Sequence, residues 1–224
     1  MNYEALFKAA NRFKEDPNSY DTCYLEARKS IDWRNLGEVP TGKVKDVVLG
    51  FLNKWKCRIP VNDRIANAIK ESFLGCAPFL RILGEQKLAE IDFMGTQTIL
   101  DHTISNRQVI RCIFAVFSDI GQRFSSVAAS KTLHMIIPEL FMIWDNDIAK
   151  NLYKIPKLNS FNYAYEYMPL MQKKANEVIE SFMRAQSCNR DDAISEISKR
   201  YHGKTLAKLL DEYNWVKAHE NQLL

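Results

Sequence analysis

Apolar residues recur along most of the chain at intervals of three and four, which is the spacing of an amphipathic α-helix. The segment 44–55 is the clearest case, with apolar side chains at positions 44, 47, 48, 51, 52 and 55. Similar spacing predicts helices over about 62–75, 105–121, 162–186, 189–203 and 205–219. No segment alternates apolar and polar residues convincingly, so no strand is predicted. The pattern therefore predicts an all-α fold.

Residues that favour helix ends mark several of these boundaries. Asn62 or Asp63, Ser105 and Asn189 each stand where a side-chain oxygen can cap a helix N-terminus, and Gly75 stands where the second helix is expected to stop. Turn-forming residues dominate 15–24 and 36–43. With no internal repeat and no low-complexity linker, residues 1–224 are predicted to form a single all-helical unit. The alternative organisation is two helical lobes, about 1–104 and 105–224.

Composition narrows the class of protein without naming an activity. The net charge of +4 and pI near 8.7 permit a nucleic-acid partner but do not require one. Five scattered cysteines and four dispersed histidines form no metal-binding spacing, and no phosphate-binding glycine loop occurs, so neither a metal nor a cofactor is expected. No signal-peptide core and no membrane-spanning apolar run are found, so a soluble, cytoplasmic protein without a membrane partner is expected.

The stretch "SSVAASKTLHMIIPELFMIWDNDIAK", residues 125–150, concentrates the candidate chemistry. It places Lys131 and His134 one turn apart in an otherwise apolar helix, and Pro138 is expected to end that helix. Asp145 then stands where a new helix begins, which is a natural position for a capping aspartate. The segment 124–130 is interpreted as a turn. A second candidate is the basic run 43–58, where Trp55 lies among lysines and could help to follow a phosphate backbone, or the run could be a solvated helix face.

The passage from Gly121 to Tyr153 resembles the core of the helix-hairpin-helix DNA glycosylases, the superfamily that includes the 8-oxoguanine glycosylases. Those proteins carry a hairpin of the type L-P-G-V-G-x-K-x-A, a helix, and a loop V-P-V-D-T-H-V-x-R that contains the catalytic aspartate. Here Ser126 and Ala128 replace the two hairpin glycines, and Lys131 stands one residue beyond the family's lysine. In "MIWDNDIAK", Asp145 matches the catalytic position.

This resemblance implies a glycosylase-like fold with a central helix-turn-helix and an Asp-capped helix, the lobes flanking a DNA-binding cleft. The implied function is base excision in DNA repair, in which the protein flips a damaged or modified base out of duplex DNA and cleaves its N-glycosidic bond. The protein is expected to be a monomer. It is expected to be cytoplasmic, or nucleoid-associated if it is prokaryotic. Asp145 would stabilise positive charge on the sugar, and Lys131 could be a nucleophile with AP-lyase activity. DNA or base contacts are expected from Ser125, Ser126, Ala128, Ser130, His134 and Trp144. A bulky modified cytosine in phage DNA is a further candidate target, which would make the protein an antiviral defence enzyme.

Each of these residues also has a purely structural interpretation. Asp145 can be a helix cap alone, Lys131 can extend its ammonium to the surface, and His134 and Trp144 can be buried packing residues. The alternative function is then a non-catalytic helical module that binds nucleic acid or another protein. A helical enzyme acting on RNA is a third hypothesis.

Overall fold

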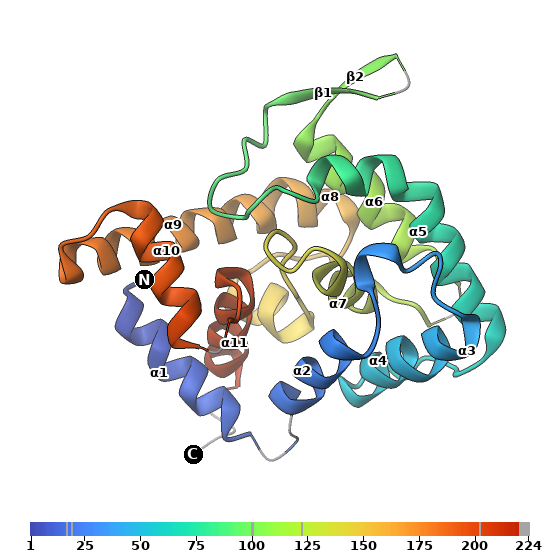
Figure 1. The fold of residues 1–224 in the computed structure, drawn as a ribbon, viewed down its shortest axis with the longest axis horizontal. Helices are drawn as coiled ribbons and strands as arrows, with labels where there is room; N and C mark the ends of the chain where they lie inside the picture. Colours follow the sequence, from blue (N-terminus) through green and yellow to red (C-terminus); the bar gives the residue numbers. More distant parts are fainter. Residues whose placement is uncertain (17, 19, 100, 122, 202, 220–224) are drawn as a thin grey trace.

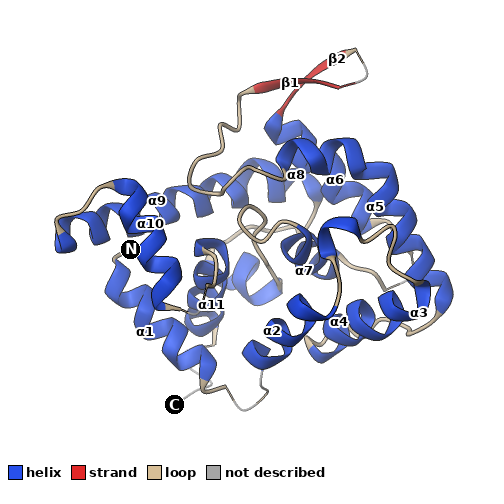
Figure 2. Cartoon of the chain, viewed as in Figure 1, coloured by secondary structure: helices blue, strands red, loops and turns tan. Residues whose placement is uncertain are grey.

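The computed structural model describes residues 1–16, 18, 20–99, 101–121, 123–201 and 203–219 (Figure 1). In this part of the chain the structure is mostly helical, which confirms the predicted all-α class at the level of helical content (Figure 2). In order along the chain, the elements are α1 (Tyr3–Lys14), α2 (Tyr20–Ser30), η1 (Trp33–Asn35), α3 (Thr41–Lys43), η2 (Val44–Leu49), α4 (Gly50–Lys54), α5 (Asp63–Leu83), β1 (Thr96–Ile99), β2 (His102–Ser105), α6 (Asn106–Ser118), α7 (Ser126–Ile136), η3 (Asp147–Leu152), α8 (Ser160–Asn162), η4 (Tyr163–Tyr167), α9 (Met168–Gln186), α10 (Arg190–Arg200) and α11 (Leu206–Ala218).

The sequence did not predict the two short strands. β1 and β2 pair antiparallel, with Thr96 opposite Ser105 and Ile99 opposite His102, and the hairpin projects away from the helices (Figure 1). Each strand has four residues, and Ile99 is the one member of the pair that is buried. Apolar and polar residues alternate along a strand only where one face of the sheet is buried. This hairpin is short and mostly exposed, so its sequence shows no such alternation.

The predicted stop at Gly75 is wrong, because α5 continues to Leu83 and passes Pro78 on the way. Apolar residues continue in helical spacing beyond the glycine, with Cys76, Leu80 and Leu83 buried against the core. Gly75 lies on the exposed side, where its lack of a side chain costs helix propensity but no packing. Burial of the continuing apolar face therefore outweighs the local preference for a stop.

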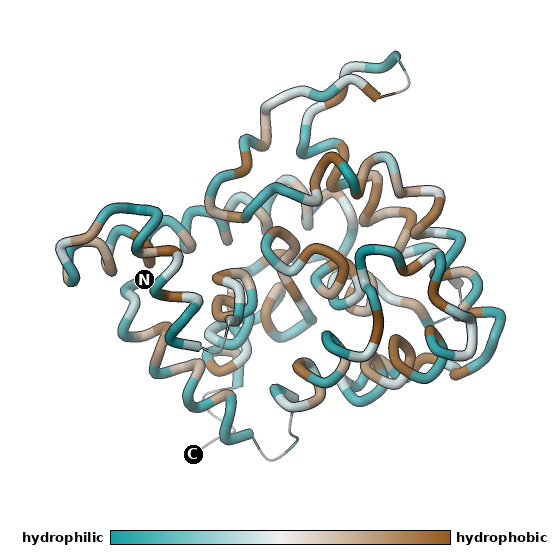
Figure 3. Tube along the Cα trace, viewed as in Figure 1, coloured by the Kyte–Doolittle hydropathy of each residue, from teal (hydrophilic) through white to brown (hydrophobic). Residues whose placement is uncertain are grey.

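Helix α7 lies at the centre of the molecule, and apolar residues surround it (Figures 1 and 3). Residues 128–136 are buried on every side of the helix, which explains why its sequence shows no polar face. One hydrophobic cluster includes residues from both halves of the chain, and α1 packs on α11 and α9. The division into lobes near residue 104 stays a prediction.

Helices α6 and α7 pack on each other and are joined by a short connection. Ser105 and Gln108 make a capping box at the start of α6, and Ser125 caps α7 by accepting a hydrogen bond from Ala128 N at 3.4 Å. Within this connection, Gly121 and Arg123 have φ of +142° and +68°. The predicted turn over 124–130 is therefore misplaced, since Ser126 already begins α7.

Candidate functional site

A pocket of about 610 Å³ opens beside the start of η3. Its walls come from the end of α1, the start of α2, the turn after α4, the first turns of α7, the segment 143–148, and α11 with the residue that follows it. Asp145 and Lys131, the two residues predicted to be catalytic, both line it. A pocket of this size falls within the range that small-molecule sites occupy.

Asp145 is half-buried and is fixed by the helix that follows it. Its Oδ1 accepts a hydrogen bond from Ile148 N at 2.8 Å, and its carbonyl accepts one from Ala149 N at 2.9 Å. This is the hydrogen bonding of a helix N-cap, so the predicted capping aspartate is confirmed. Its Oδ2 has no protein hydrogen-bond partner among the described residues, which leaves one carboxylate oxygen for a ligand in the pocket.

Lys131 does not reach the surface; its side chain is held inside the pocket wall. Its Nζ donates to the Trp55 carbonyl at 2.8 Å, lies 3.8 Å from Cys57 Sγ, and sits 5.4 Å from the centre of the Trp55 ring. An ammonium has three N–H groups, so with the Trp55 carbonyl and Cys57 Sγ as acceptors one donor is left for a ligand. Burial raises the pKa of the Cys57 thiol, although the Lys131 ammonium acts against it.

The turn that follows α4 brings Trp55 and Cys57 to the pocket. Asn53 closes it, because its Oδ1 accepts from Ile59 N at 2.6 Å and its Nδ2 donates to Ile59 O at 2.8 Å. Lys56 and Arg58 within it adopt left-handed backbone conformations, with φ of +61° and +55°. Residues other than glycine rarely adopt this backbone conformation. The two hydrogen bonds of Asn53 therefore hold the turn in a conformation that its sequence does not favour.

Aromatic rings form one wall of the pocket. Trp215 packs edge-to-face on Phe13, with ring centroids 5.3 Å apart, and Tyr20 lies 5.6 Å from Trp55. Trp55 is 8% exposed, and its indole Nε1 has no hydrogen-bond partner in the structure although the atom is buried. A buried donor without an acceptor is costly.

The residues predicted to contact DNA or base do not share one surface. Ser125 is exposed and lines the pocket. Ser126 Oγ instead donates to Leu158 O at 2.8 Å, and Ala128 is fully buried. Ser130 is also buried, where its Oγ bonds Val127 O at 2.9 Å and the Trp144 backbone at 3.3 Å. Of these four residues, only Ser125 is placed to meet a ligand in this pocket.

His134 lies in the core, outside the pocket, with no exposed surface. Its Nδ1 lies 2.6 Å from Phe141 O and its Nε2 lies 3.2 Å from the Tyr24 hydroxyl. The carbonyl can only accept, so Nδ1 carries the proton and Nε2 accepts from Tyr24. Burial lowers the pKa of His134 to about 3, against the opposing effect of the Phe141 carbonyl. Both ring nitrogens are engaged, and this arrangement leaves none for a phosphate or a base.

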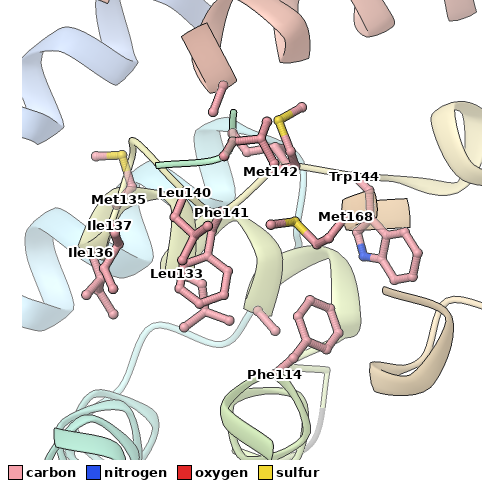
Figure 4. Close-up of a cluster of buried hydrophobic side chains, with 14 of the residues drawn as sticks. Phe114, Leu133, Met135, Ile136, Ile137, Leu140, Phe141, Met142, Trp144 and Met168 are labelled. Carbon is pink, nitrogen blue, oxygen red and sulfur yellow. The ribbon is translucent and has the colours of Figure 1, made fainter. Parts of the chain in front are cut away.

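Trp144 is a core residue as well, although it directly precedes Asp145. It has no exposed surface and packs edge-to-face on Phe114 and Tyr163, with ring centroids 5.8 and 5.0 Å apart. Figure 4 shows its indole in the same buried cluster as Phe114 and Met168. Its Nε1 donates to Ser126 O at 3.3 Å. Trp144 therefore ties the loop before Asp145 to the first turn of α7 and does not face a ligand.

Sequence reasoning missed the contribution of α11. Asp211, Trp215 and His219 all line the pocket, and they recur at intervals of four on one face of that helix. That spacing is visible in "DEYNWVKAH", where a carboxylate, an indole and an imidazole follow one another along a helical stripe. The signal could have been found by asking which polar residues share a face with the aromatic ones.

Comparison with protein-family models, curated proteins and solved structures finds no match. No helix in the described ranges is both long and apolar enough to cross a bilayer. Within those ranges, no three His, Cys, Asp or Glu side chains are grouped so that they could hold a metal ion.

Proposed function

We propose that the protein is a DNA glycosylase that flips a damaged or modified base out of duplex DNA and cleaves its N-glycosidic bond. The observation that carries this proposal is the position of Asp145. It follows a helix pair, α6 and α7, and a loop, and it caps the next helix with one carboxylate oxygen left for a ligand. This is the order of elements in the helix-hairpin-helix glycosylases that residues 121–153 resemble. Lys131 from the first turns of α7 lies in the same pocket.

The chemistry of base release fits the arrangement around Asp145. As the bond between C1′ and the base nitrogen breaks, positive charge develops on the sugar. A carboxylate held in place stabilises that charge more effectively than mobile water does, and it can also take a proton from the attacking water. Asp145 is fixed by two backbone hydrogen bonds, so it would not need to reorganise during the reaction.

The remaining walls of the pocket suit a flipped base. Trp55 and Trp215 line the pocket and offer aromatic surface for stacking, and the ammonium of Lys131 can donate to base oxygens or nitrogens. Lys54, Lys56 and Arg58 are exposed on and beside the turn that carries Trp55, where they could contact phosphates. The pocket volume leaves room for a base with a large substituent, so a bulky modified cytosine of phage DNA joins oxidised purines as a candidate substrate.

Lys131 has two possible roles in such an enzyme. As a nucleophile it must lose a proton, and its hydrogen bond to the Trp55 carbonyl requires it to act as a donor. As an ammonium it would position the base or the phosphate. The first role gives AP-lyase activity and the second a monofunctional enzyme, and borohydride trapping of a lysine adduct separates them.

A non-catalytic nucleic-acid-binding or protein-binding module is the second candidate. The hydrogen bond from Ile148 N to Asp145 Oδ1 favours it, because capping alone would account for an aspartate at this position. In this case the pocket would bind its ligand without changing it.

The decisive experiment compares wild type with Asp145→Asn on duplexes that contain unmodified, oxidised, deaminated, alkylated or glucosylated hydroxymethylcytosine bases. Abasic sites are detected by alkaline cleavage. Asparagine retains the capping oxygen but not the charge, so the variant should fold and lose base release by about 100-fold or more. Asp32→Asn is the matched control, since Asp32 also caps a helix, by accepting from Arg34 N at 3.0 Å, but does not line the pocket. If folded wild type releases no base from any duplex, the glycosylase proposal is wrong and the binding module is favoured.

A further inference from the structure

A buried network of charges lies behind the pocket, along α11. Lys204 Nζ is 2.7 Å from Asp21 and 2.8 Å from Glu212, while Lys208 Nζ is 3.0 Å from Asp211 and 3.2 Å from Glu212. All five residues are under a tenth exposed. Lys208 and Glu212 lie one turn apart on one face of α11, and Lys204 precedes that helix by two residues.

The charges in this network do not balance when every group is ionised. Three carboxylates face two ammonium groups, which leaves one net negative charge in the interior. An uncompensated buried charge is costly, so the network has a reason to hold one extra proton. The two carboxylates close to Lys208 keep the pKa of its ammonium above the ordinary value, although burial acts in the opposite direction. The proton is therefore held on a carboxyl group.

Asp211 is the member of the network that can present this proton to a ligand. It lines the pocket, whereas Asp21 and Glu212 do not. Its Oδ2 takes the hydrogen bond from Lys208, and its Oδ1 has no hydrogen-bond partner within the described ranges. Burial raises the pKa of Asp211 to about 6, with Glu212 and Asp145 acting in the same direction and Lys208 against it. The other titratable groups that act electrostatically with Asp211 are Tyr24 on α2 and Tyr167 on η4.

We propose that Asp211 is a second catalytic carboxyl group, which protonates the departing base while Asp145 acts on the sugar and the attacking water. This inference rests on the proposed function. The bond between C1′ and the base nitrogen breaks, and its electron pair goes to the base. The Asp211 proton neutralises the base at a ring nitrogen or an exocyclic oxygen. Water oxygen bonds to C1′, and the proton that the water loses goes to Asp145. Solvent then takes the proton from Asp145 and returns one to Asp211.

A protonated donor matters because a free base leaves poorly as an anion. General-acid catalysis of this kind contributes about 10²- to 10⁴-fold in rate. Enzymes often place two carboxyl groups with different pKa values in one site, so that one is protonated and acts as a general acid while the other is ionised. Asp211 can act only on substrates whose departing base has a nitrogen or oxygen that accepts a proton and lies within reach of α11.

The test is single-turnover base release from pH 4.5 to 8.5, on the substrate identified with wild type. The wild-type rate should fall above about pH 6, as Asp211 loses its proton. Asp211→Asn should lose this dependence and be about 100-fold slower at pH 5.5. Asp211→Glu keeps a titrating group and should restore part of the rate and its decline with pH. Asp32→Asn is the matched control, because Asp32 neither lines the pocket nor belongs to the charge network.

The outcomes separate the two proposals. A folded Asp211→Asn variant with wild-type rate and pH profile overturns the role of Asp211 and leaves the glycosylase proposal standing. An equal loss of the pH dependence in Asp32→Asn also overturns it, since a carboxylate remote from the pocket would then have the same effect. Absence of base release by wild type overturns the glycosylase proposal and this role with it. In that case, a ¹³Cγ NMR titration that finds one aspartate signal titrating near pH 6, absent in Asp211→Asn, would show that Asp211 holds a proton without using it in catalysis.

Discussion

The ammonium group of Lys131 donates a 2.8 Å hydrogen bond to the carbonyl oxygen of Trp55, which joins the central helix α7 to the turn after α4. The contact links residues 76 positions apart and forms one corner of the pocket. Because Lys131 is 6% exposed, its ammonium has lost most of its contact with water, and this bond replaces part of that hydration. This contact gives Lys131 a structural role. A test of catalysis by Lys131 must therefore distinguish a loss of stability from a loss of chemical reactivity.

Replacing Lys131 with methionine should therefore destabilise the protein. Methionine fills similar space but leaves the Trp55 carbonyl without its donor, and an unpaired buried acceptor costs about 1–3 kcal/mol. Urea unfolding followed by circular dichroism measures the change. Lys150→Met is the control, since Lys150 is exposed on η3 and its replacement should change the free energy of unfolding by less than about 0.5 kcal/mol. Equal stability of the two variants would show that the Lys131 bond contributes nothing.

Two substitutions of Asp145 should differ in stability. Alanine removes the oxygen that accepts from Ile148 N, and losing an N-cap costs about 1 kcal/mol, in a range of about 0.5–2. Asparagine keeps an accepting oxygen and should stay within a few tenths of wild type. Denaturant unfolding of both variants makes the comparison. Loss of stability in Asp145→Asn equal to that in Asp145→Ala would mean that the charge of Asp145, and not its hydrogen bond, supports η3.

The sequence predicted those parts of the site that lie within one continuous segment. Pro138 was expected to end a helix, and α7 does end at Ile136; Asp145 was expected to cap the next helix, and it does. These features depend on backbone chemistry that acts over a few residues. The presence of Lys131 and Asp145 in one pocket follows from the same local pattern, because a single helix and loop connect them.

The parts of the site that depend on distant contacts could not be predicted in this way. His134 shares a helical face with Lys131 in the sequence, yet Tyr24 and Phe141 enclose it in the core. The charges of Lys208 and Asp211 resemble those of a solvated face, but both residues are buried, and the rings of Phe13, Tyr24 and Trp55 lie against the Lys208 ammonium. Helical spacing tells which residues share a face. It does not tell whether that face meets water, another helix or a pocket.

Trp144 should behave as a packing residue and not as a DNA contact. Its indole is enclosed by Phe114, Tyr163 and Tyr167, so truncation to alanine should lower the free energy of unfolding by about 3–5 kcal/mol. Phe161→Ala is the control, because Phe161 is 48% exposed and loses far less packing. Thermal unfolding gives a first ranking and urea unfolding the free energies. A stable Trp144→Ala variant with weakened DNA binding would restore the interpretation drawn from the sequence.

His134 should make the protein sensitive to acid. Its pKa is lowered to about 3 in the folded state by burial, while an unfolded chain has the ordinary value near 6.5. Between these values the unfolded chain binds the proton and the native protein does not. The contribution of His134 to stability is therefore complete above about pH 6.5 and is lost as pH falls, by up to about 1.4 kcal/mol per pH unit. Asp211, whose pKa is raised to about 6, acts in the opposite direction from about pH 6 down to about pH 4.

Comparison of wild type with His134→Gln isolates the histidine, because Asp211 is common to both proteins. Glutamine can hydrogen-bond but does not titrate in this range. The variant should be less stable at pH 7.5, where its packing is imperfect, and the difference should shrink steadily as the pH is lowered from 6.5 to 4.5. Urea unfolding at intervals of half a pH unit measures it. Stability curves that stay parallel over this range would mean that His134 binds its proton equally in the native and unfolded states, so that burial does not lower its pKa.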